Sequence, residues 1–143
     1  MENELKKLSA YEKELLLKAP VLLSILASST DHKVDRKEKK EAIELSHLRT
    51  FTSPPMLQDF YKEVELGFKT NLEELLLKYE PFDEAKQGLI KLEIKNIYTI
   101  LQKLDHDFAN DLKMSLESYG KHVANVHVKF TDFFDFNNFT TFN

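Results

Sequence analysis

The sequence predicts an all-α protein, a compact bundle of about six to seven short helices, and three observations lead to this prediction. Apolar residues recur three and four positions apart over most of the chain, which is the spacing that gives a helix one buried face. The chain has only 3 glycines and 4 prolines, and the prolines stand where helices should begin or end. Before residue 129, no stretch alternates polar and apolar residues as a half-buried strand does.

Three helices are expected in the first third of the chain. Leucines at helical spacing mark the first one, which ends before Pro20: Leu5, Leu8, Leu15 and Leu16. Pro20 suits the first position of the second helix, because its missing N–H would have no partner there. After a polar turn, the third helix runs from Asp35 to about His47, and Asp35 and Glu38 have the spacing of a capping box.

Two further helices are expected between residues 53 and 81. Ser53 is expected to cap the first of them, with a proline in the first helical position and an apolar stripe that ends at Phe68. Asn71 can cap a second, short helix that continues to Tyr79, and Pro81 then breaks the chain direction.

A long helix and a final helix are predicted after Pro81. One carries isoleucines and leucines at alternating spacings of four and three and is expected to lie in the core: Ile90, Ile94, Ile97, Leu101 and Leu104. The chain should bend near residues 105–107, and the final helix then runs from Phe108 to Val126. Residues 1–128 are thus predicted to form one helical domain.

Composition bounds the location and the partners. The chain of 143 residues has no cysteine, which excludes disulfides, thiolate zinc sites and cysteine nucleophiles. Its first residues mix acids and bases, and its longest apolar run, 21–27, is too short to span a bilayer, so a cytoplasmic location is expected. A net charge of −4 and a pI near 5.7 argue against nucleic acid as a partner.

The candidate site is the acidic turn before the third helix. Asp31, Asp35 and Glu38 form the pattern D-x-x-x-D-x-x-E, and three carboxylates at a turn can bind a divalent cation such as calcium or magnesium. The turn is not an EF-hand, because the glycine and the alternating acids of that loop are missing. The alternative is that Asp35 and Glu38 only cap the helix. Nearby basic residues weaken a cation site and form a solvated face, with phosphate binding as a less favoured role: Lys33, Arg36, Lys37, Lys39 and Lys40.

The residues that enzymes commonly use are sparse. Glu44 and His47 form one E-x-x-H pattern, whereas di-iron bundles need two copies and two further glutamates. The three glycines stand alone, so the chain has neither a nucleophile elbow nor a phosphate-binding loop. We expect a non-enzymatic protein, for which a divalent cation, calcium or magnesium, is the candidate cofactor. A metal-dependent enzyme that uses Glu44 and His47 is the last alternative.

The tail of residues 129–143 differs from the rest of the chain. Six phenylalanines stand among aspartate, asparagine and threonine without a clear helical period: Phe130, Phe133, Phe134, Phe136, Phe139 and Phe142. Because that much exposed aromatic surface favours aggregation, the tail should pack on the domain or on a protein partner, including a second copy of the chain.

The turn and its flanking helices resemble the start of TerB-like domains, the tellurite-resistance-associated family. The similarity lies in an apolar helix followed by Ser-Thr-Asp31-x-x-Val34-Asp35-x-x-Glu38, in residues 41–60, and in the late stretch 118–124, which are similar to bacterial members. His32 stands where the family often has glycine. The resemblance implies a compact all-helical domain with Asp31, Asp35 and Glu38 as divalent-metal ligands, and a role in stress-response or envelope-associated assemblies.

Overall fold

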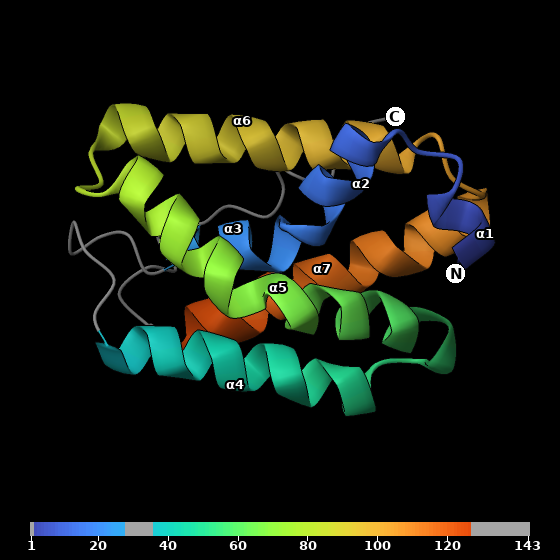
Figure 1. Cartoon of the computed structure of the whole chain (residues 1–143), viewed down its shortest axis with the longest axis horizontal. Coiled ribbons are helices and arrows are strands. Elements are labelled where there is room, and N and C mark those ends of the chain that lie inside the picture. The colour runs from blue at the N-terminus through green and yellow to red at the C-terminus, as the bar shows by residue number, and fades with distance from the viewer. Residues whose placement is uncertain (1, 28–35, 127–143) are drawn as a thin grey trace.

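The structure, a computed structural model, describes residues 2–27 and 36–126 of the chain. These residues form seven helical segments and no strand (Figure 1). They are α1 Glu2–Leu5, α2 Ala10–Leu17, α3 Ala19–Ala27, α4 Arg36–Thr52, α5 Pro55–Tyr79, α6 Glu84–Leu101 and α7 His106–Val126. Five of the seven have nine residues or more. The all-α prediction is confirmed, although these five main helices are slightly fewer than the six to seven expected, and four of them, α4 to α7, are long.

The short helix α3 forms the centre of the bundle. All nine of its residues are buried, and it packs against α5, α6 and α7. Figure 1 shows it between α6 and α7; α4 runs along the bottom of the view beside the first part of α5, and the second part of α5 rises toward α6. A fully buried valine, leucine or isoleucine contributes about 1.5–3 kcal/mol, so this apolar segment supplies a large share of the driving force for folding.

The start of the chain forms two helices where the sequence predicts one. Ser9 separates α1 from α2 and caps α2, because its Oγ accepts from Glu12 N at 3.1 Å while Glu12 Oε1 accepts from Ser9 N at 3.0 Å. The leucine spacing continues through the turn, so periodicity alone did not show the break. A single residue, Lys18, then joins α2 to α3.

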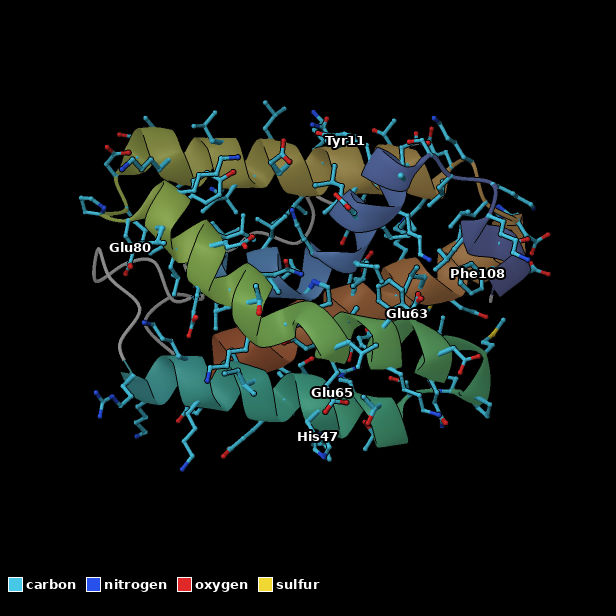
Figure 2. All side chains as sticks on the ribbon, in the orientation of Figure 1. Tyr11, His47, Glu63, Glu65, Glu80 and Phe108 are labelled. Atoms are coloured by element: carbon cyan, nitrogen blue, oxygen red, sulfur yellow. The ribbon has the colours of Figure 1, made fainter. Side chains whose placement is uncertain are left out.

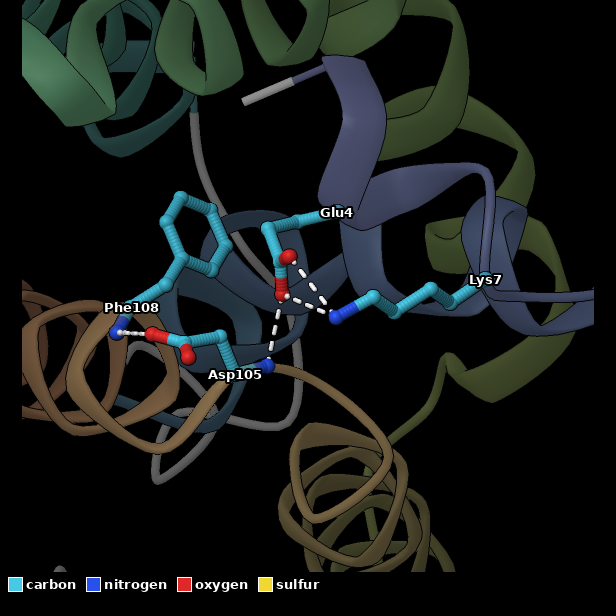
Figure 3. A network of polar contacts seen from close by, with 4 residues as sticks. All are labelled: Glu4, Lys7, Asp105 and Phe108. Carbon is cyan, nitrogen blue, oxygen red and sulfur yellow. Dashed lines mark hydrogen bonds and ion pairs between the residues drawn. The ribbon is translucent and has the colours of Figure 1, made fainter.

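Two carboxylates from this region bind the turn between α6 and α7. Figure 3 shows Glu4, whose Oε1 accepts from Asp105 N at 2.6 Å and whose other oxygen lies 2.8 Å from Lys7 Nζ. Asp105 in turn caps α7, since its Oδ2 accepts from Phe108 N at 3.3 Å. Glu12 pairs with Lys103 of the same turn. The predicted bend near residue 105 is confirmed.

The hairpin of α4 and α5 corrects two predictions. The N-cap of α5 is Pro54, not Ser53, and the Ser53 hydroxyl is buried without a hydrogen-bond partner. Asn71 does not begin a new helix, because α5 is continuous over 25 residues. Its buried face passes directly from Phe68 to Leu72, so the apolar stripe supplies no reason to break the helix there.

No helix in the described ranges combines the length and the apolar character needed to cross a membrane.

Candidate functional site

The predicted cation site lies mostly outside the described residues. Asp31 and Asp35 belong to 28–35, and Glu38 lies in the first turns of α4 with its side chain outside the description. Among the side chains that are described, no group of three or more metal-ligating residues could hold an ion. The cation site therefore stays a prediction. The phenylalanine-rich tail, 129–143, also falls outside the description.

The E-x-x-H pair lies on the exposed side of the α4–α5 hairpin. His47 Nδ1 pairs with Glu65 Oε1, so this histidine links the two helices (Figure 2). The side chain of His47 is 60% exposed and that of Glu65 is 37% exposed. Glu44 is also exposed and lines a groove one turn nearer the start of α4.

That groove, which we call the basic groove, lies between the first half of α4 and the second half of α5. Its volume is about 380 Å³. Four cationic, two acidic and two apolar side chains line it: Arg36, Lys39, Lys40, Lys69, Glu44, Glu73, Ile43 and Leu72. The lining therefore carries a net formal charge of about +2 on a chain whose net charge is −4.

Helical spacing explains why these residues share one groove. On α4, Arg36, Lys40 and Ile43 are separated by four and three positions and so lie on one face. On α5, Lys69 and Leu72 fall within one turn. The two helices run antiparallel and pack together over part of their length, and they diverge where the first half of α4 lies opposite the second half of α5 (Figure 1).

The groove has an apolar floor and an exposed charged rim. Leu72 is 2% exposed, and Ile43 is half-buried against the hydrophobic core. Arg36, Lys40 and Lys69 are exposed, so their ammonium or guanidinium groups stand in water at the ends of long stems. Such a site combines apolar burial with attraction for carboxylates or phosphates.

A second hollow of similar volume, about 380 Å³, lies at the corner between α6 and α7. It is lined by Leu101, Gln102, Leu104, His106, Ala109, Asn110 and Lys113. Lys113 is the one formally charged side chain in this lining, and the others are apolar or polar. The basic groove is therefore the more highly charged of the two surfaces.

A set of tyrosines holds the helices around the site in place. Tyr119 OH lies 3.2 Å from Ser24 Oγ of α3, and Tyr61 OH lies 2.6 Å from Ser115 Oγ of α7. Arg49 of α4 stacks over the Tyr119 ring at 5.6 Å. Burial raises the pKa of Tyr61 and of Tyr119 above the ordinary tyrosine value. Both hydroxyls thus stay protonated at neutral pH and serve as hydrogen-bonding links between helices.

One carboxylate on α7 has a buried oxygen without a hydrogen-bond partner. Glu117 Oε1 is buried without a hydrogen-bond partner, and burial raises the pKa of its carboxyl group. Burial, and to a smaller extent the charge of Glu117, also raises the pKa of Tyr98 on α6. Lys113 and Lys121 partly offset the shift at Glu117.

No protein-family model matches the chain, and no curated protein or solved structure is significantly similar to it. The TerB resemblance accordingly stays a prediction from the sequence motifs.

Sequence reasoning found half of the basic groove. The cations of α4 were recognised as a solvated face, but their apposition to Lys69 and Leu72 was not. The predicted helix break at Asn71 hid it, because it placed Lys69 in the link between two helices and Leu72 in the second of them. A continuous α5 with Lys69 one turn before Leu72 is the pattern that could have shown the second wall.

Proposed function

We propose that this chain is a cytoplasmic, non-enzymatic, TerB-like helical domain that works as an interaction module and binds acidic, apolar segments of proteins in its basic groove. A weak divalent-cation site formed by Asp31, Asp35 and Glu38 is the second part of the proposal. The basic groove is the observation that carries the first part. The TerB resemblance supports the second part and a role in stress-response assemblies.

The size and lining of the groove favour a peptide as its ligand. A volume of about 380 Å³ lies within the range of ligand sites, roughly 300–1,000 Å³, and holds a few side chains. Ile43 and Leu72 offer apolar area, while the cationic rim selects carboxylates. A local positive field on an acidic chain also steers negative ligands to this face and repels them elsewhere.

A titration of the full ¹⁵N-labelled chain tests the groove. The probe is a synthetic peptide that combines aspartate and phenylalanine, and the control peptide has asparagine in place of each aspartate. We expect amide shifts over residues 36–44 and 69–73 with the acidic peptide, and much weaker binding of the control. Shifts elsewhere, or equal binding of both peptides, would contradict the proposal.

Charge reversal supplies a matched pair of variants. Lys40→Glu with Lys69→Glu replaces two attractions by two repulsions, each on the order of 1 kcal/mol at an exposed site, and should weaken peptide binding at least about tenfold. Lys62→Glu with Lys95→Glu makes the same change in net charge at exposed positions outside the groove. This second variant should bind as the parent does. If both double variants weakened peptide binding equally, the effect would come from the overall charge of the protein and not from the groove.

The cation site is tested by calcium and magnesium titrations followed by amide NMR. We expect shifts at residues 31–38 at millimolar metal, and their loss in Asp35→Ala. If the acids only cap α4, Asp35→Ala lowers the free energy of unfolding by about 1 kcal/mol whether or not metal is present, and the parent shows no metal-dependent shift. That pair of results would remove the cation half and leave the peptide groove intact.

A further inference from the structure

Resting on the proposed function of the basic groove, we infer that its resident ligand is the C-terminal segment of the same chain, residues 129–143. In this arrangement the segment is an internal competitor, and an external partner must displace it to bind.

The composition of the segment matches the lining of the groove. Asp132 and Asp135 outnumber its single base, Lys129, and six phenylalanines surround them. The groove presents the opposite balance, because four cations and the two carboxylates of Glu44 and Glu73 give its lining a net formal charge of about +2 around the apolar side chains of Ile43 and Leu72. Carboxylates within the rim and one or two phenyl rings on the floor would satisfy both surfaces.

The position at which the segment leaves the helical domain favours binding to the groove of its own molecule. Arg49 Nη2 of α4 donates to Ser118 Oγ of α7 at 3.3 Å, so the two side chains connect these helices at this level. Figure 1 shows that α7 ends at the same end of the bundle at which α4 begins. Eight residues of α7, about 12 Å, separate Ser118 from Val126, and eight residues back along α4 from Arg49 is Glu41, the neighbour of Lys40.

The length of chain after Val126 is sufficient for the path. Residues 127–143 span at most about 60 Å when extended, which exceeds the length of α5, the longest described helix, at about 37 Å for its 25 residues. A tethered ligand at that reach has an effective concentration on the order of millimolar. Even a weak peptide contact would therefore be occupied within one molecule before a second copy could compete at micromolar concentration.

The absence of cysteine from the chain allows a direct test. Asn138→Cys places a nitroxide spin label in the segment of the full ¹⁵N-labelled protein. We expect amides of residues 36–44 and 69–73 to lose most of their intensity and to recover when the label is reduced. The control label, Asn96→Cys, is exposed on α6, on the far side of the bundle from α4 in Figure 1, and should leave these amides unchanged.

Two additions separate the remaining arrangements. In a mixing experiment, protein that carries the spin label but no ¹⁵N is added to ¹⁵N-labelled protein without a spin label. Broadening of the groove amides in this mixture would assign the segment to a second copy and overturn the inference. Lys40→Glu with Lys69→Glu should abolish the broadening within one molecule, whereas Lys62→Glu with Lys95→Glu should retain it. Broadening that survives the groove variant would place the segment elsewhere and also overturn the inference.

The acidic peptide described above distinguishes failure of this inference from failure of the proposed function. If the Asn138 label never broadens the groove but the peptide shifts its amides, the internal ligand is wrong and the interaction module stands. If neither affects the groove, both proposals are wrong. If both hold, added peptide should restore the intensity of the broadened amides as it displaces the segment.

Discussion

Tyr119 allows a prediction in which the sign of a stability change reverses with pH. Its ring is fully buried, its hydroxyl lies 3.2 Å from Ser24 Oγ, and burial raises its pKa. Tyr119→Phe removes this hydrogen bond, while Ser24 keeps its 2.9 Å bond to the carbonyl oxygen of Pro20. A net loss of about 1 kcal/mol in the free energy of unfolding is therefore expected at neutral pH.

At alkaline pH the parent should lose this advantage. Above about pH 10, tyrosine in the unfolded chain releases its proton, whereas buried Tyr119 keeps it because its folded-state pKa is raised. The unfolded state then binds fewer protons, and stability falls by about 1.4 kcal/mol per pH unit for this one group. The stability linked to Tyr119 is thus fully present below pH 10 and is lost above it. Since phenylalanine has no proton to release, the variant should become the more stable protein near about pH 11.

Urea unfolding followed by circular dichroism, repeated from about pH 8 to 11.5, measures both curves. Tyr11→Phe is the matched control, because the Tyr11 side chain is 69% exposed in the folded protein and its loss should leave the alkaline slope unchanged. The reasoning is refuted if Tyr119→Phe keeps the parent's slope above pH 10, since the phenol would then be equally solvated in both states.

Three further predictions follow from single positions. Gly88→Ala should stabilise the protein by about 1 kcal/mol in chemical denaturation, because a Cβ there meets nothing within 4 Å. Gly67→Ala should raise the free energy of unfolding by less, because its Cβ would lie 3.2 Å from Asn71 Nδ2. Ser9→Ala should cost about 1 kcal/mol in the same assay by removing the capping box of α2, and an unchanged midpoint would show that this cap is not formed. Glu117→Gln should be more stable than the parent at pH 7, because burial raises the pKa of this carboxyl group and so opposes its ionisation in the folded state. The difference should vanish as the pH falls below about 4, where the carboxyl group is protonated in both the folded and the unfolded state. A difference that persists in acid would contradict burial of the charge as its cause.

Local patterns were sufficient to predict most of the helices. The apolar spacing predicted the buried faces of α6 and α7, and the bend between them falls where residues 105–107 placed it. These features depend on helical periodicity and on the charge and capping chemistry of neighbouring residues, which a sequence displays directly. The division of the first segment at Ser9 was missed, although Ser9 and Glu12 carry the spacing of a capping box.

The groove could not be predicted in full because it depends on two segments about 30 residues apart. The spacing of Lys40 and Ile43 assigns them to one face of α4, but no local pattern states that Leu72 lies opposite. The same limit applies at Ser53, where the expected capping residue is displaced by one position. Its hydroxyl is buried by the packing of the hairpin, and a preference for serine at helix starts contains no information about that packing.

The contacts of Glu4 and Glu12 with the α6–α7 turn also constrain how the chain folds. Their partners, Asp105 and Lys103, lie 101 and 91 residues further along the chain. On a ribosome, α1 and α2 consequently lack these partners until most of the polypeptide has emerged, while the neighbouring α4 and α5 can pair early at small loop-closure cost. The amino-terminal helices should therefore be among the last elements to dock, and their protection from hydrogen exchange should appear late in refolding.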